Sequence, residues 1–87
     1  MEIENIKTAL EINNYDCYIR GTEKRNKFIM GGIKDEKSLL KPDNSFNIFI
    51  VLDRIKLNYF EGQILIEKKF DDIEALIDFI KIKFPLD

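Results

Sequence analysis

The 87 residues, 45% hydrophobic and 34% charged, are enough for one domain spanning residues 1–87 and too apolar for a disordered chain. A net charge of −2 lacks the positive balance that favours nucleic acid or anionic lipid as a partner. The absence of histidine, together with a single cysteine, excludes imidazole catalysis, Cys/His metal sites and internal disulfides.

The first predicted element is a helix over residues 2–13. Ile3, Ile6 and Leu10 recur at helical spacing and form one narrow apolar stripe. Asn13 and Asn14 follow, and asparagine tolerates the left-handed conformation found at helix ends. The helix is therefore expected to stop there.

A β-hairpin is predicted over residues 15–34. Tyr15, Cys17 and Ile19 alternate with polar neighbours, which is typical of a half-buried strand. The polar, charged residues 21–27 are expected to form the loop, and residues 28–34 the returning strand. Gly31 and Gly32 inside this strand predict a bulge or a close backbone approach.

Three more strands are expected over residues 46–52, 55–60 and 63–67, after a long connection over residues 35–45 that includes a turn at Pro42. Residues 46–52 are apolar on both sides, with Phe49 and Val51 opposite the side that carries Phe46. Gly62 is suited to the tight turn between the last two strands. The three strands are expected to form a meander.

The last predicted element is a helix over residues 73–84, ended by Pro85. Asp71 and Glu74 have the spacing of a capping box. Phe79 and Ile82 lie beside the main apolar stripe and widen it. This flank is expected either to be buried or to contact another chain.

These elements predict an α+β fold, a two-layer sandwich of an antiparallel sheet of about five strands with an N-terminal and a C-terminal helix. With both helices on one face of the sheet, Phe49 and Val51 lie on the other. This face is expected to be covered by the long connection, a second copy or a partner. Phe49, Val51, Phe79 and Ile82 are the candidate residues of such an interface.

No catalytic or metal-binding group is found in the sequence. Ser38 and Ser45 have no histidine to activate them, and Cys17 falls on the inward side of its strand. The acidic residues near the last helix lack the ligand spacing of a calcium loop. We therefore expect no enzyme activity, no catalytic residues, no metal and no cofactor.

Positive charge concentrates in residues 20–41, which contain seven Lys and Arg residues but only three acidic ones. This block is predicted to project from the first hairpin, either as a solvated loop or as a contact with an acidic protein surface or with phosphates. The candidate partner-binding residues are Tyr18, Arg20, Gly21, Thr22, Glu23, Lys24, Arg25 and Lys27.

An N-terminal helix that runs into Asn14-Tyr15, followed by Ile19 and then by Gly21-Thr22-Glu23 at the turn, carries a family resemblance. Over residues 1–23 the chain resembles the small prophage-encoded anti-CRISPR proteins, which inhibit the type II effector nuclease. The resemblance implies that the loop after the first strand contacts the nuclease where DNA would bind. Fifteen isoleucines, eleven lysines and only two alanines indicate a genome of low GC content, bacterial or phage.

The expected function is that of a small, non-enzymatic, protein-binding inhibitor, encoded by a phage or mobile element, that blocks a bacterial nuclease or defence complex by steric occlusion. An acidic N-terminus and the absence of a long apolar run favour a soluble, cytoplasmic protein without a membrane partner. One alternative is a nucleic-acid-binding module that uses the basic hairpin with Tyr18 and Phe28. Another is a homodimeric accessory protein that pairs around Phe49 and Val51.

Overall fold

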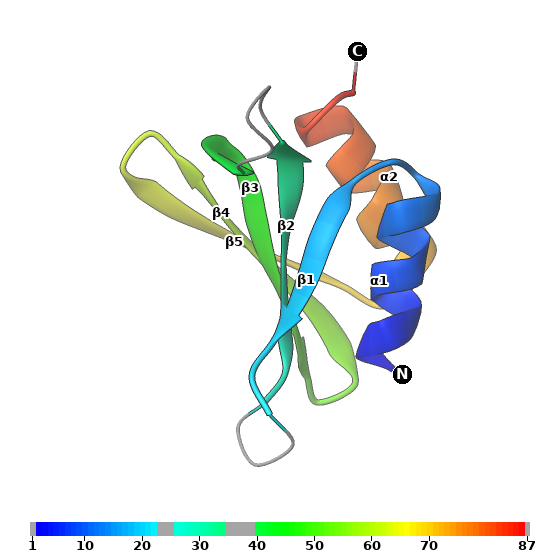
Figure 1. The fold of residues 1–87 in the computed structure, drawn as a ribbon. Helices are drawn as coiled ribbons and strands as arrows, with labels where there is room; N and C mark the ends of the chain where they lie inside the picture. The colour runs from blue at the N-terminus through cyan, green and yellow to red at the C-terminus, as the bar shows by residue number, and fades with distance from the viewer. Residues whose placement is uncertain (1, 23–25, 35–39, 87) are drawn as a thin grey trace.

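The computed structural model describes residues 2–22, 26–34 and 40–86, with the backbone alone at 34 and 40–43. Within these ranges two helices flank five strands: α1 (Ile3–Ile12), β1 (Asp16–Arg20), β2 (Phe28–Lys34), β3 (Leu40–Val51), β4 (Arg54–Glu61), β5 (Ile64–Phe70) and α2 (Ile73–Lys83). The strands form one antiparallel sheet in chain order, β1-β2-β3-β4-β5, and both helices lie on the same side of it (Figure 1). The predicted fold class is confirmed.

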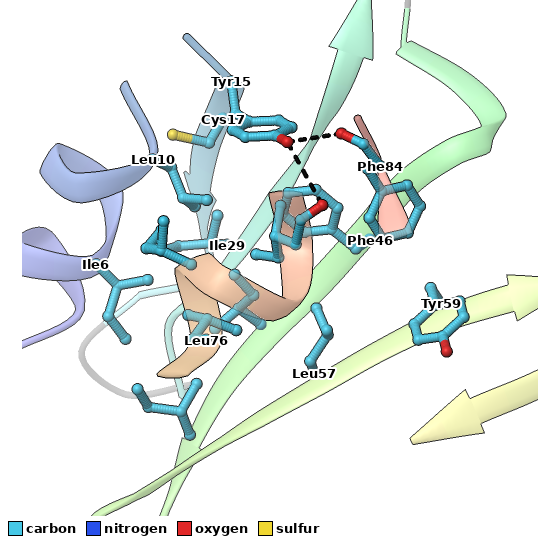
Figure 2. Packing of buried hydrophobic residues seen from close by; sticks show 14 of the residues in the cluster. Ile6, Leu10, Tyr15, Cys17, Ile29, Phe46, Leu57, Tyr59, Leu76 and Phe84 are labelled. Carbon is cyan, nitrogen blue, oxygen red and sulfur yellow. Dashed lines mark hydrogen bonds between the residues drawn. The ribbon is translucent and has the colours of Figure 1, made fainter. Parts of the chain in front are cut away.

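The hydrophobic core fills the space between the sheet and the helices. Alternate side chains of each strand point toward the helices, as the pleat of a strand requires, and Ile29, Ile48 and Leu57 are fully buried there. The helices contribute their apolar stripes: Ile3, Ile6 and Leu10 from α1, and Leu76, Ile77 and Ile80 from α2. One core therefore holds both helices and the central strands together (Figure 2).

An aromatic cluster closes one end of this core. The Tyr15 hydroxyl donates a hydrogen bond to the carbonyl oxygen of Phe84 at 2.6 Å and lies 3.4 Å from that of Ile80 (Figure 2). The Phe46 ring lies between them, with its centroid 6.3 Å from that of Tyr15 and 5.2 Å from that of Phe84. These contacts fix the end of α2 to the strand that follows α1.

The third strand begins earlier than the sequence pattern predicts. Residues 40–45, which we expected to belong to a connection with a turn at Pro42, extend β3 to Leu40. Pairing of β3 with β4 starts only at Asn47, so residues 40–46 have one unpaired edge. On its other edge β3 pairs with β2 at Leu40 and again from Ser45, and Pro42 falls in the irregular stretch between these pairs. A proline outside the regular ladder removes no hydrogen bond from the sheet, which is why Pro42 is compatible with a strand here. The predicted helical turn at Leu39 lies outside the described residues.

The glycine pair in β2 has the predicted role. The pairing of β2 with β3 shifts register between Gly32 and Lys34, as at a bulge. A Cβ atom on Gly31 would lie 2.8 Å from the Phe46 ring, so its absence makes room for that side chain. Gly32 has a φ of +154° and lies against the backbone of Asn44.

Positive φ angles mark two of the turns. Asn14 has a φ of 69° just after α1, which confirms the predicted helix stop. Leu52 and Asp53, with φ angles of 52° and 61°, form the tight turn between β3 and β4. Two consecutive positive φ angles are typical of a two-residue hairpin turn, where glycine and asparagine are usual and leucine is not.

The N-terminus of α2 differs from the predicted capping box. The Asp72 carboxylate, not that of Asp71, accepts a hydrogen bond from the Ala75 amide at 2.7 Å. Asp71 instead accepts one from Arg54 Nε at 2.8 Å across the exposed surface. The sequence pattern therefore placed the cap one residue too early.

The two aspartates should differ in their effect on stability. We expect Asp72→Ala to lower the free energy of unfolding by about 1 kcal/mol, because a helix amide loses its acceptor. Asp71→Ala is the matched control and should cost roughly half of that or less, since an exposed ion pair contributes little. Urea denaturation followed by circular dichroism measures both. A larger loss for Asp71→Ala would contradict the assignment of the cap.

Candidate functional site

The side of the sheet opposite the helices is the candidate site, and we call it the open face. It is built from the outward-pointing residues of all five strands. These include Tyr18, Arg20, Phe28, Met30, Asn47, Phe49, Val51, Lys56, Asn58, Phe60, Leu65, Glu67 and Lys69. None of the described helices lies on this side (Figure 1).

One row of the open face places two aromatic rings between cations. Register places Arg20 beside Phe28, and Phe49 beside Lys56, which in turn pairs with Lys69. The Phe28 and Phe49 rings stack with centroids 5.2 Å apart and planes 20° apart. The Lys56 ammonium lies 5.8 Å from the centre of the Phe49 ring. The row therefore crosses all five strands and is held at its centre by a ring stack and a cation–π contact.

The adjacent row is more polar at its centre. It consists of Tyr18, Met30, Asn47, Asn58 and Glu67, one from each strand. Tyr18 is 40% exposed and Met30 37% exposed. The Oδ1 atom of Asn58 is buried and has no hydrogen-bond partner among the described residues. The centre of the open face thus combines apolar surface with an amide oxygen that lacks a donor.

Charge on the open face is partly neutralised within the chain. Lys56 Nζ lies 3.1 Å from a Glu67 carboxylate oxygen, and Arg54 bonds Asp71 as described above. Within the described ranges, Arg20 and Lys69 make no ion pair, although Arg20 lies 5.8 Å from the centre of the Tyr18 ring. The cations of this face therefore lie among acids and aromatic rings rather than in one basic patch.

A hollow of about 230 Å³ lies at one end of the open face. Its lining comes from the β3–β4 turn and from the neighbouring strands: Val51, Leu52, Arg54, Lys56, Glu67 and Lys69. Leu52 is 93% exposed at this turn, and its backbone is in the unfavourable left-handed region. The hollow is therefore bordered by an exposed leucine held in a strained turn.

The structure separates the hairpin residues that the sequence grouped together. Tyr18 and Arg20 lie on the open face, and Phe28 lies beside Arg20. Gly21, with a φ of 89°, ends β1, and Thr22 follows it on the surface. Lys27 instead turns toward α1, with its Nζ 3.6 Å from a Glu4 oxygen. The predicted contacts at Glu23, Lys24 and Arg25 lie outside the described residues.

The second predicted interface is not one surface. Phe49 and Val51 lie on the open face, whereas Phe79 and Ile82 belong to α2 on the opposite side of the sheet. Phe79 packs against Tyr59 and Phe70, with ring centroids 6.0 and 5.5 Å away. Ile82 is 81% exposed. Of the two residues that widen the apolar stripe of α2, Phe79 therefore packs against the core and Ile82 faces solvent.

Three apolar residues of the open face were missed by the sequence analysis: Met30, Phe60 and Leu65. Phe60 and Leu65 pair with each other near the end of the β4–β5 hairpin and are 56% and 53% exposed. The two-residue periodicity of these strands identifies them. Met30 and Phe60 lie out of phase with the buried residues of β2 and β4, and Leu65 lies out of phase with the half-buried Ile66 of β5.

Cys17 is buried on the helix side of β1, where its Sγ lies 3.7 Å from the Lys7 carbonyl oxygen. Burial raises the pKa of the Cys17 thiol, which keeps it protonated and weakly nucleophilic at neutral pH.

Over the described ranges, no three Cys, Asp or Glu side chains gather as metal ligands would. None of the helices in those same ranges has the length and apolar character needed to cross a membrane. No protein-family model, curated protein or solved structure matches this chain.

Proposed function

We propose that this chain is a non-enzymatic inhibitor that binds a bacterial nuclease or defence complex and blocks it by steric occlusion, with the open face as its contact surface. The observation that carries the proposal is a sheet face that no described element covers and that presents four exposed or half-buried aromatic side chains: Tyr18, Phe28, Phe49 and Phe60. The resemblance of residues 1–23 to anti-CRISPR proteins supports the class of target. Encoding by a phage and action in the bacterial cytoplasm belong to the same proposal.

The composition of the open face favours a protein as the partner. Aromatic residues, methionine and arginine are enriched in the centres of protein–protein interfaces, and Tyr18, Phe28, Met30 and Arg20 adjoin one another here. Tyrosine and arginine are also the residues whose truncation most often abolishes binding. The presence of an acid, Glu67, among the cations of this face suits a protein surface better than a phosphate backbone.

The test measures DNA cleavage by a panel of purified type II effector nucleases with their guides at rising concentrations of this protein. We expect concentration-dependent inhibition of at least one complex. Tyr18→Ala should weaken that inhibition by roughly 30-fold or more, as truncation of a central tyrosine does at other interfaces. Ile82→Ala is the control, because Ile82 is more exposed than Tyr18 and lies on the opposite layer. Equal losses in the two variants would contradict the assigned surface, and no inhibition across the panel would contradict the target class.

A second candidate function, single-stranded nucleic-acid binding, is favoured by one observation, the row that joins Arg20, Phe28, Phe49, Lys56 and Lys69. Bases stack on aromatic rings, and flanking cations bind phosphates. Fluorescence anisotropy with labelled oligonucleotides at low salt separates the two functions. Affinity that falls steeply as salt rises and is lost in Phe49→Ala would support this function over the first.

A further inference from the structure

The β5 strand forms one edge of the sheet. It pairs with β4 along one side, and no described strand pairs with its other side. Five of its seven residues are exposed, the exceptions being Ile66 and Phe70. An unpaired edge presents backbone N–H and C=O groups that readily pair with another strand. This edge is therefore available for contact with a second chain.

The two halves of β5 differ in chemistry. The first half is apolar, with Ile64 67% exposed and Leu65 53% exposed. The second half carries Lys68 and Lys69, and Glu67 lies at the midpoint of the strand. Lysines commonly protect an edge from pairing, but here they occupy only one half of it. The apolar half lies at the end of the β4–β5 hairpin (Figure 1), where Glu61 forms an ion pair with Lys83 of α2.

We propose that β5 pairs in antiparallel fashion with β5 of a second copy, around a two-fold axis at Glu67, so that two five-stranded sheets become one continuous sheet. In this register Ile64 is opposite Phe70 of the second copy, and Leu65 is opposite Lys69 of the second copy. Each pair joins residues from the same side of the sheet, so the helices of both copies lie on one side and the open faces on the other. The contact is isologous, as in most dimers.

In this register, favourable pairs form on both sides of the sheet. On the helix side, the exposed Ile64 comes beside the second copy's Phe70, which packs against Phe79 of α2 with ring centroids 5.5 Å apart. On the open side, each Glu67 carboxylate is diagonal to Lys69 of the other copy, within the reach of long side chains. These two diagonal pairs offset the repulsion between the two Glu67 carboxylates. The apolar pair Ile64–Phe70 and the diagonal pair Glu67–Lys69 are therefore the contacts that favour a second copy at this edge.

Cross-linking tests the register. Opposite Cα atoms in an antiparallel pair are about 4.5–5.5 Å apart, which suits a disulfide. A Glu67→Cys variant should therefore form a covalent dimer under mild oxidation, seen on a non-reducing gel, because position 67 faces itself. Ile82→Cys is the control, since Ile82 is 81% exposed but lies on α2. Cross-linking at 82 that matches or exceeds that at 67, or none at 67, would overturn the proposal.

The oligomeric state gives a second, independent test by sedimentation equilibrium. The wild-type protein should dimerise, and Lys69→Glu and Glu67→Lys should each raise the dimer dissociation constant at least tenfold, because each replaces the two diagonal attractions between positions 67 and 69 with repulsions. An equimolar mixture of the two variants should recover the dimer, since an acidic strand then faces a basic one. Lys81→Glu, an exposed charge reversal on α2, is the control.

A wild-type monomer at millimolar concentration would overturn the proposal, as would a dimer that both charge variants leave intact. Failure of the mixture to recover the dimer would do the same. None of these measurements involves a nuclease, so the dimer and the proposed inhibition succeed or fail separately.

Discussion

Gly32→Ala is expected to lower the free energy of unfolding by about 3 kcal/mol or more. The new Cβ atom would lie 2.2 Å from the Asn44 carbonyl oxygen and 2.8 Å from the Ser45 Cα atom. Both neighbours are backbone atoms of the paired strand, so relief requires β2 and β3 to separate at the register shift. The φ of +154° adds a conformational cost for any L-residue other than glycine.

Urea denaturation followed by circular dichroism measures this loss, with Gly62→Ala as the matched control. Gly62 also has a positive φ, +61°, but a Cβ atom there would meet no atom within 4 Å. Its substitution should cost only about 1–2 kcal/mol, the price of the left-handed backbone. Equal losses in the two variants would show that the contact with Asn44 is not what makes Gly32 necessary.

Phe46→Ala is expected to lower the free energy of unfolding by about 3–5 kcal/mol, within the range for truncation of a buried phenylalanine. Phe46 is 2% exposed and packs between Tyr15 and Phe84, so its loss leaves a cavity at the junction of the sheet with α2. The Tyr15 hydroxyl and its carbonyl partner on Phe84 border this cavity, which limits how far the site can collapse. Chemical denaturation measured at several concentrations of the protein gives the value.

A double-mutant cycle tests why Phe46 fits. A Cβ atom on Gly31 would lie 2.8 Å from the edge of the Phe46 ring, so Gly31→Ala should cost about 1–3 kcal/mol in the wild-type protein. In a Phe46→Leu background the same change should cost less, because the smaller side chain vacates that space. If the loss in the double variant equals the sum of the two single losses to within about 0.5 kcal/mol, the two residues do not share one site.

The sequence predicted the elements that bury one face and expose the other, because their apolar residues then recur at a regular spacing. The stripes of Ile3, Ile6 and Leu10 and of Leu76, Ile77 and Ile80 identified both helices because each packs one face against the sheet. The beginning of β3 was missed, because residues 40–46 have a neighbour on one edge only and carry the polar residues that also favour turns. The α2 cap was misplaced because Asp71 and Asp72 are chemically equivalent, and only backbone geometry distinguishes them.

The candidate site was predicted less completely than the fold. Alternation within one strand placed Phe49 and Val51 on the outer side, as the structure has them. The stacking of Phe28 on Phe49 depends on the register between β2 and β3, which no local pattern specifies. Lys27 was assigned to the hairpin contact from its charge, whereas its ion pair with Glu4 depends on where α1 lies.

The order of the strands also bears on how the chain reaches its native state. Each strand pairs with the next along the chain, so every hairpin closes a short loop at low entropic cost. The contact between the two terminal helices and the Tyr15–Phe84 hydrogen bond instead join segments as far as 69 residues apart. Contacts between segments far apart in the chain form more slowly than those between neighbouring strands, so we expect the meander to form before the two helices pack together on its face. Completion of the helical layer is then the slow step of folding.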